Sequence, residues 1–169
     1  GASYEDIARR GGGIMSSVRA TRRATEDELV HSARRRLDAL LADGCATVEI
    51  KSGYGLDTAT ELRMLRAATR LGAETGVTVR RTLLAAHALP PEFRDNMDGY
   101  VDLVCREMLP AALKENLVDM VDAYLESIAF HGEHVDRIFE RARALGLPLR
   151  LHADQLTAGG GAELAARHG

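Results

Sequence analysis

The feature that most constrains this chain is a repeated alternation of short apolar segments with longer segments of helical periodicity. The strand-like segments cover Thr47–Ile50, Val77–Ala86, Val121–Ala129 and Leu149–His152. Between consecutive strand-like segments, apolar residues recur three and four positions apart, as they do on one face of a helix. This alternation predicts a parallel sheet of about four strands with helices packed outside it.

Cap residues set the expected limits of the helices. Thr25 with Glu28, and Thr58 with Glu61, have the Thr-x-x-Glu spacing of a capping box, in which each side chain satisfies a free backbone N–H group. Residues 14–24 show no clear periodicity, and we expect a loop there. The predicted helices cover residues 3–10, 29–41, 62–71, 98–116, 135–145 and 162–167.

Four strand–helix units suit either half of a (β/α)₈ barrel or an open, doubly wound sheet. No strand is followed by a glycine-rich phosphate loop, and Gly159-Gly160-Gly161 lacks the spacing of a dinucleotide fingerprint. The sequence therefore favours an α/β fold of the partial TIM-barrel type, with outer helices. We treat residues 1–169 as part of one barrel domain, and we expect the chain to be an excerpt of a longer protein, since it opens on Gly1.

Charged side chains recur on one face of the predicted sheet. Counting in steps of two places the following charged residues on that face: Glu49, Lys51, Arg81, Asp122, Glu126 and Arg150. The opposite face carries apolar residues suited to packing under helices, among them Val48, Ile50, Leu84, Val121 and Leu151. Because isolated buried charges are costly, we expect the charged face to form a network of ion pairs.

Polar clusters follow three of the predicted strands. They are Lys51-Ser52-Gly53-Tyr54-Gly55, Ala86-His87-Ala88-Leu89-Pro90 and His152-Ala153-Asp154-Gln155. Active sites of barrel enzymes lie at the carboxyl ends of the strands. Each cluster alone is explained by a turn or by a satisfied core histidine, but three in succession favour a functional site. His131 and His134 are three residues apart without a third ligand nearby, so we do not favour a metal site there.

Composition excludes some classes of partner. The formal net charge is −3, which gives no bulk attraction to nucleic acid. No apolar stretch approaches the roughly 20 residues that a membrane-spanning helix requires. Cys45 and Cys105 are too few for a disulfide framework or a thiolate metal site, which fits reduced thiols in a cytoplasmic protein.

Several strings, taken in order along the chain, resemble the imidazolonepropionase family of the amidohydrolase superfamily. The most specific are Lys51-Ser52-Gly53-Tyr54-Gly55-Leu56 and His152-Ala153-Asp154-Gln155-Leu156, with Ala86-His87-Ala88-Leu89-Pro90 between them. Weaker matches precede them, at Ser3–Ile7, Gly11–Ile14 and Val18–Arg22. The resemblance implies that the chain covers about strands two to five of a metal-binding (β/α)₈ barrel.

The resemblance also implies roles for individual residues. His152 matches a metal-binding histidine, and Tyr54 and His87 match residues that contact the substrate. Gln155 matches a position near substrate and metal; a glutamine cannot act as a carboxylate base, so an orienting role is implied. The implied cofactor is one Zn²⁺ or Fe ion, with its other ligands outside this chain. The implied assembly of the full-length protein is a homodimer.

The implied reaction is hydrolysis of 4-imidazolone-5-propanoate to N-formimidoyl-L-glutamate, with His87 donating a hydrogen bond to the developing oxyanion. Two alternatives stay open at this point. One is another metal-dependent amidohydrolase, such as a cyclic ureide or nucleobase deaminase. The other is a half-barrel that has no catalytic activity and serves as an assembly module. We expect the 169-residue chain by itself to be inactive, because His152 is its only strong ligand candidate at the site.

Overall fold

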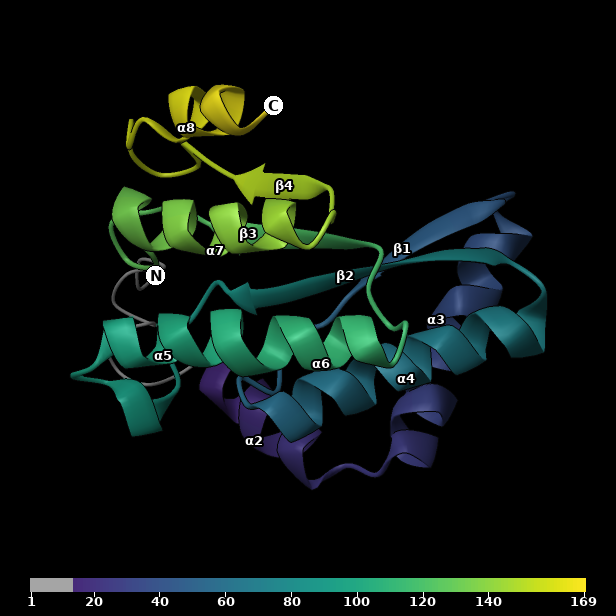
Figure 1. Ribbon diagram of the computed structural model, residues 1–169. Coiled ribbons are helices and arrows are strands. Elements are labelled where there is room, and N and C mark those ends of the chain that lie inside the picture. Colours follow the sequence, from purple (N-terminus) through teal and green to yellow (C-terminus); the bar gives the residue numbers. More distant parts are fainter. Residues whose placement is uncertain (1–13) are drawn as a thin grey trace, which may run out of the picture.

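Four parallel strands form a single sheet in the computed structural model, which describes residues 14–169. The strands are β1 (Thr47–Lys51), β2 (Thr78–Ala86), β3 (Met120–Tyr124) and β4 (Leu149–His152), and they lie side by side in sequence order. The four predicted strands are therefore confirmed, as is their parallel arrangement (Figure 1). The helix expected over residues 3–10 falls outside the described residues, so it stays a prediction.

Helices precede, connect and follow the strands. Their bounds are α2 (Ile14–Arg23), α3 (Glu26–Ala42), α4 (Thr58–Thr75), η1 (Pro91–Phe93), α5 (Met97–Leu103), η2 (Val104–Met108), α6 (Leu109–Lys114), α7 (Gly132–Ala144) and α8 (Gly161–His168). The capping box at Thr25 and Glu28 is present at the start of α3. Among these residues, no helix is both long and apolar enough to cross a bilayer.

Helices α5 and α6 form one continuous rod, as predicted for residues 98–116, with the wider π-turn η2 between them. The cause lies at Pro110, which has no N–H group and whose ring clashes with the carbonyl four residues earlier. The Leu109 N–H group correspondingly reaches back five residues to the carbonyl of Val104. One proline thus produces a local bulge without ending the helix.

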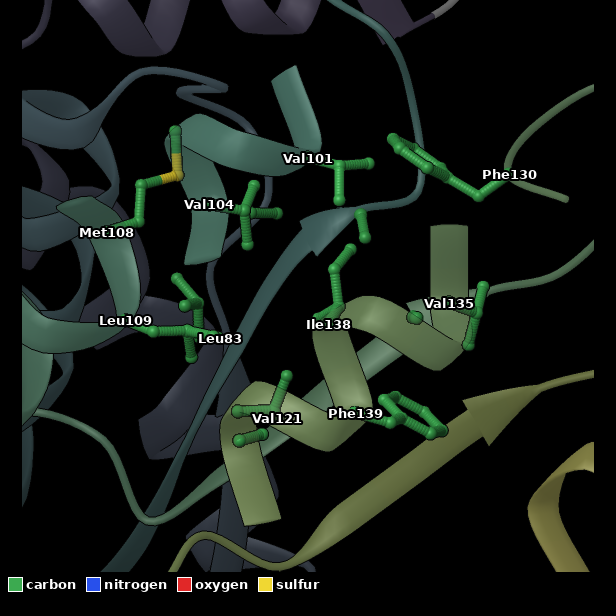
Figure 2. Packing of buried hydrophobic residues seen from close by; sticks show 14 of the residues in the cluster. Leu83, Val101, Val104, Met108, Leu109, Val121, Phe130, Val135, Ile138 and Phe139 are labelled. Carbon is green, nitrogen blue, oxygen red and sulfur yellow. The ribbon is translucent and has the colours of Figure 1, made fainter. Parts of the chain in front are cut away.

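The apolar core lies between the sheet and one layer of helices. Leu83 and Val121 project from the strands toward Met108, Leu109 and Ile138, and all five side chains are buried (Figure 2). Helices α4, α6 and α7 all lie on this side of the sheet (Figure 1). A doubly wound sheet carries helices on both faces, whereas a barrel carries them only outside. The one-sided packing therefore identifies the fold as part of a (β/α)₈ barrel, as predicted.

The other face of the sheet carries the expected network of charges. The Lys51 ammonium lies 2.8 Å from a carboxylate oxygen of Glu49 and 2.8 Å from one of Asp122. Arg150 lies 3.4 Å from Glu49, and His152 lies 3.1 Å from Asp122. The prediction of a paired network is confirmed for Glu49, Lys51, Asp122 and Arg150, and His152 joins them. Glu126, predicted to belong to the network, instead bonds the loop after β4.

The predicted face of Arg81 is wrong. Arg81 aligns with Ile50, and Thr82 aligns with Lys51, so Arg81 points to the helix side and Thr82 to the charged side. Asp119 makes this position tolerable for an arginine, because its carboxylate accepts hydrogen bonds from both the backbone and the guanidinium of Arg81. Leu84, predicted to pack under helices, consequently falls on the charged side, and Leu83 takes its place in the core.

Two other local predictions need correction. Residues 14–23 form helix α2, where a loop was expected, because buried Val18 and the partly buried Ile14 and Met15 give it an apolar face. Strand β3 ends at Tyr124, although a strand to Ala129 was predicted. The chain turns after Tyr124, where the Ala129 N–H group bonds to the carbonyl of Glu126, and the Glu126 side chain accepts hydrogen bonds from the loop that follows β4.

Candidate active site

The three predicted polar clusters lie at the carboxyl ends of β1, β2 and β4. Since the strands are parallel and adjacent, these ends share one edge of the sheet. The loop after β1, Ser52–Leu56, is buried except for Tyr54, whose exposed fraction is 41%. The aromatic ring of Tyr54 is therefore the part of this loop that is available to a ligand.

A buried carboxylate holds the loop after β1. Glu61, in the first turn of α4, accepts hydrogen bonds from the backbone N–H groups of Gly53, Gly55 and Leu56 at 2.7, 2.8 and 2.8 Å. The predicted capping box of Thr58 and Glu61 is wrong for this reason. Asp57 caps α4 instead, by accepting a hydrogen bond from the Thr60 N–H group.

Gly53 is required at its position by both conformation and space. Its φ of +107° lies in the region that side chains rarely adopt. A Cβ atom there would lie 2.7 Å from the carbonyl oxygen of Leu84 and 2.9 Å from Nε2 of His87. The missing side chain therefore lets β2 and the His87 ring approach the loop closely.

His87 lies against this loop. Its Nε2 is hydrogen bonded to the carbonyl oxygen of Gly53, and its ring centroid is 5.9 Å from that of Tyr54. A carbonyl can only accept, so Nε2 carries the proton. Burial is the main influence on the ring, and it lowers the pKa of His87 below the usual 6.5. Near pH 7 the ring is thus neutral, with Nδ1 unprotonated.

His152, at the end of β4, is oriented by Asp122 on β3. Asp122 is 1% exposed, and one of its oxygens accepts a hydrogen bond from Nδ1 of His152 at 3.1 Å. The other oxygen accepts from Lys51 at 2.8 Å. Partial burial opposes the charge of Lys51, but its bonds to Asp122 and Glu49 outweigh this effect and raise its pKa. With Nδ1 donating, Nε2 of His152 keeps a lone pair, and the side chain is 45% exposed.

The loop after β4 carries Gln155 and is exposed from Asp154 to Gly160. Glu126 anchors it by accepting hydrogen bonds from the Leu156 N–H group at 2.8 Å and the Thr157 N–H group at 3.1 Å. The Thr157 hydroxyl also donates to Glu126. This hydroxyl, followed by backbone donors, lowers the pKa of Glu126 to about 2. Gln155 thus lies on an anchored but exposed loop.

The described residues supply one well-oriented candidate for a metal ligand. Within residues 14–169, no three His, Cys, Asp or Glu side chains come together as a ready metal site. His131 and His134 have ring centroids 5.8 Å apart, and His134 is buried against Phe130. His152 fits a ligand role best, because a carboxylate on the far ring nitrogen is the usual partner of a metal-bound histidine.

Sequence reasoning predicted Tyr54, His87, His152 and Gln155 as site residues, but it missed how Glu61 and Glu126 hold their loops. Asp122 was placed on the correct face by period-two counting, although its bond to His152 was not foreseen. A spacing signal existed for Glu61, because it stands shortly after a Gly-x-Gly turn. No local signal existed for Glu126, whose loop partners are 30 and 31 residues away.

Comparison with known proteins gives close relatives over the whole chain. The imidazolonepropionase of Rhizorhabdus wittichii is 61% identical over all 169 residues, and that of Methylobacterium nodulans is 62% identical over the same length. That of Shewanella baltica is 57% identical over the whole chain. The chain spans 41–42% of the length of these relatives. No family model matches the chain.

The fold also has a counterpart among solved structures. The adenine deaminase from Arthrobacter aurescens superposes with a TM-score of 0.54 over 95% of this chain and 54% of that protein, at 15% sequence identity. At that identity the likeness concerns the fold alone, and it agrees with the one-sided α/β sheet described above. By its sequence, the chain is similar over its whole length to these imidazolonepropionases, and it corresponds to about two fifths of their length.

Proposed function

We propose that residues 1–169 are part of the barrel domain of an enzyme that hydrolyses 4-imidazolone-5-propanoate to N-formimidoyl-L-glutamate. In this reaction the hydroxyl of a water molecule adds to the ring carbonyl carbon, the amide C–N bond breaks, and the released ring nitrogen takes up a proton. The observation that carries the proposal is the placement of Tyr54, His87 and His152 along one edge of the sheet. The proposal includes a cytoplasmic, homodimeric enzyme without nucleic-acid or membrane partners.

His152 is suited to bind a metal ion through Nε2, because its Nδ1 is hydrogen bonded to Asp122 and Nε2 is left free. When bound, a Zn²⁺ or Fe ion polarises a carbonyl and lowers the pKa of its water to about 7. A catalytic zinc site usually has three protein ligands, so parts of the protein beyond this chain would supply the others. The part of Asp122 and Lys51 in this proposal is to keep the His152 ring in the ligating orientation.

His87 contributes at the reacting carbonyl in our proposal. A hydrogen bond to the developing oxyanion needs an N–H group, and the Nε2 proton is already donated to Gly53. We therefore assign the task to Nδ1, which takes up the proton that the attacking water releases and can then donate a hydrogen bond to the oxyanion. Tyr54, beside His87 and exposed, binds the substrate, and Gln155 orients it from the loop after β4.

The test is steady-state kinetics of the full-length enzyme, following loss of imidazolone absorbance. Replacing His87→Ala is expected to lower kcat/KM by about 10²-fold, the usual cost of an oxyanion partner. His31→Ala, on the exposed surface of α3, is the matched histidine control and should leave kcat/KM unchanged. Equal kinetics of the two variants would remove His87 from the mechanism. Turnover of adenine, with none of the imidazolone, would favour the deaminase alternative.

A further inference from the structure

Glu61 is a fully buried carboxylate that the proposed reaction does not yet use. Its exposed fraction is 0%, and burying an ionised carboxylate is costly unless its oxygens are hydrogen bonded. Three backbone N–H groups meet this need, one at Oε2 and two at Oε1. All three belong to the loop that presents Tyr54, so the carboxylate organises that loop.

The donors bracket Tyr54 on both sides. Gly53 lies before it, and Gly55 and Leu56 lie after it. The loop contains two left-handed residues, Gly53 with φ +107° and Leu56 with φ +56°. A leucine adopts this conformation only when its surroundings hold it there, and here its N–H group is bonded to Glu61. The direction of the Tyr54 side chain is therefore fixed by the carboxylate beneath it.

Gly53 connects Glu61 to His87. Its N–H group donates to Glu61, and its carbonyl oxygen accepts the proton on Nε2 of His87. If the N–H bond to Glu61 is lost, the carbonyl is free to turn away, and His87 loses the partner that determines which ring nitrogen carries the proton. Arg22 also contacts this loop, by donating a hydrogen bond to the carbonyl oxygen of Gly55.

We propose that Glu61 is a positioning residue for the reaction: its carboxylate fixes the loop Ser52–Leu56 and, through Gly53, the tautomer of His87. The roles of Tyr54 and His87 in turnover rest on the function proposed above. The effect of Glu61 on the His87 tautomer does not, because it follows from the hydrogen bonds alone.

Replacing Glu61→Gln tests the proposal in the full-length enzyme. The amide keeps the shape of the side chain but has a single acceptor oxygen, so at least one loop N–H group faces an NH₂ group. Glu61→Asp, which keeps the charge but is one methylene shorter, is a milder second variant in case Glu61→Gln folds poorly. The matched control is Asp119→Asn, which removes a partly buried carboxylate at the opposite edge of the sheet, where it holds Arg81.

Two measurements separate positioning from mere stability. We expect the kcat of Glu61→Gln to be at least about tenfold lower than that of Asp119→Asn, although both variants lower the midpoint of unfolding to a similar extent. In spectra of ¹⁵N-histidine-labelled enzyme, the His87 ring, identified by its absence in His87→Ala, should show the Nε2–H form in wild type and a mixture of forms in Glu61→Gln. Glu61→Asp should fall between them in both measurements.

A Glu61→Gln enzyme with wild-type kcat and an unchanged His87 spectrum would overturn the proposal. The tautomer measurement also keeps this proposal distinct from the proposed function. If the wild-type enzyme fails to turn over the imidazolone, the function is wrong, and the His87 spectra of the two Glu61 variants still decide whether Glu61 positions the ring.

Discussion

The loops after β1 and β4 are both anchored by a buried glutamate, but they differ in where that glutamate comes from. Glu61 lies 5 to 8 residues after its partners, on the helix that follows the loop. Glu126 lies 30 and 31 residues before its backbone partners, on the neighbouring strand connection. The first loop is buried apart from Tyr54, whereas the second is exposed from Asp154 to Gly160.

This difference shows two ways to hold the loops that border the candidate active site. The loop after β1 closes within a single strand–helix unit, so little chain entropy is lost in forming it, and it is rigid wherever that unit folds. The loop after β4 is held by Glu126, from the connection between two units, and its residues from Asp154 to Gly160 are exposed. We expect it to open more readily, and the following variants test this contrast.

The largest effect is expected for Gly53→Ala. A Cβ atom would meet the Leu84 carbonyl at 2.7 Å in a backbone conformation that alanine avoids, so we expect a loss of about 3 kcal/mol in the free energy of unfolding. The matched control is Gly44→Ala, with φ +90° and no atom within 4 Å, which carries the conformational cost of about 1 kcal/mol without the clash. Denaturant titration measures both, and equal losses would show that the loop adapts.

An intermediate, pH-dependent effect is expected for Glu126→Gln. The folded-state pKa of Glu126, about 2, lies below its ordinary value of 4.5, so its stabilising contribution is complete above pH 4.5 and is lost as the pH falls toward 2. The difference in unfolding free energy between wild type and variant should therefore be constant from pH 5 to 7 and shrink below pH 4.5. A difference that grows on acidification would contradict the anchoring role of this carboxylate.

The smallest effect is expected for Tyr54→Phe. The ring stays in place, because the loop is held through its backbone, and only the hydroxyl is removed. Loss of one hydrogen bond to substrate should raise KM about three- to tenfold with kcat nearly unchanged. Steady-state kinetics of the full-length enzyme measure this change. A large fall in kcat would instead give the hydroxyl a part in the chemistry.

The sequence was sufficient to predict the sheet because each strand has its own apolar pattern and each helix its own periodicity. It also indicated Tyr54, His87, His152 and Gln155, since these residues follow strands. Their roles stay predictions. The sequence did not reveal pairing between distant segments. Arg81 faces the helices because Asp119, 38 residues away, accepts hydrogen bonds from it. Glu61 was misread for a different reason, since a capping box and a loop anchor have the same local spacing.

The hydrogen bonds of Asp122 have a consequence for how the whole sheet assembles. This aspartate on β3 accepts hydrogen bonds from Lys51 on β1 and from His152 on β4. Its alignment with Arg150 places it on the charged face of the sheet. Because neighbouring residues of a strand point to opposite faces, a slip of β3 by one residue would turn Asp122 toward the helices. His152 would then lose its orientation. Under the function proposed above, only a correctly aligned sheet presents this histidine to a metal, so misassembled chains would be inactive.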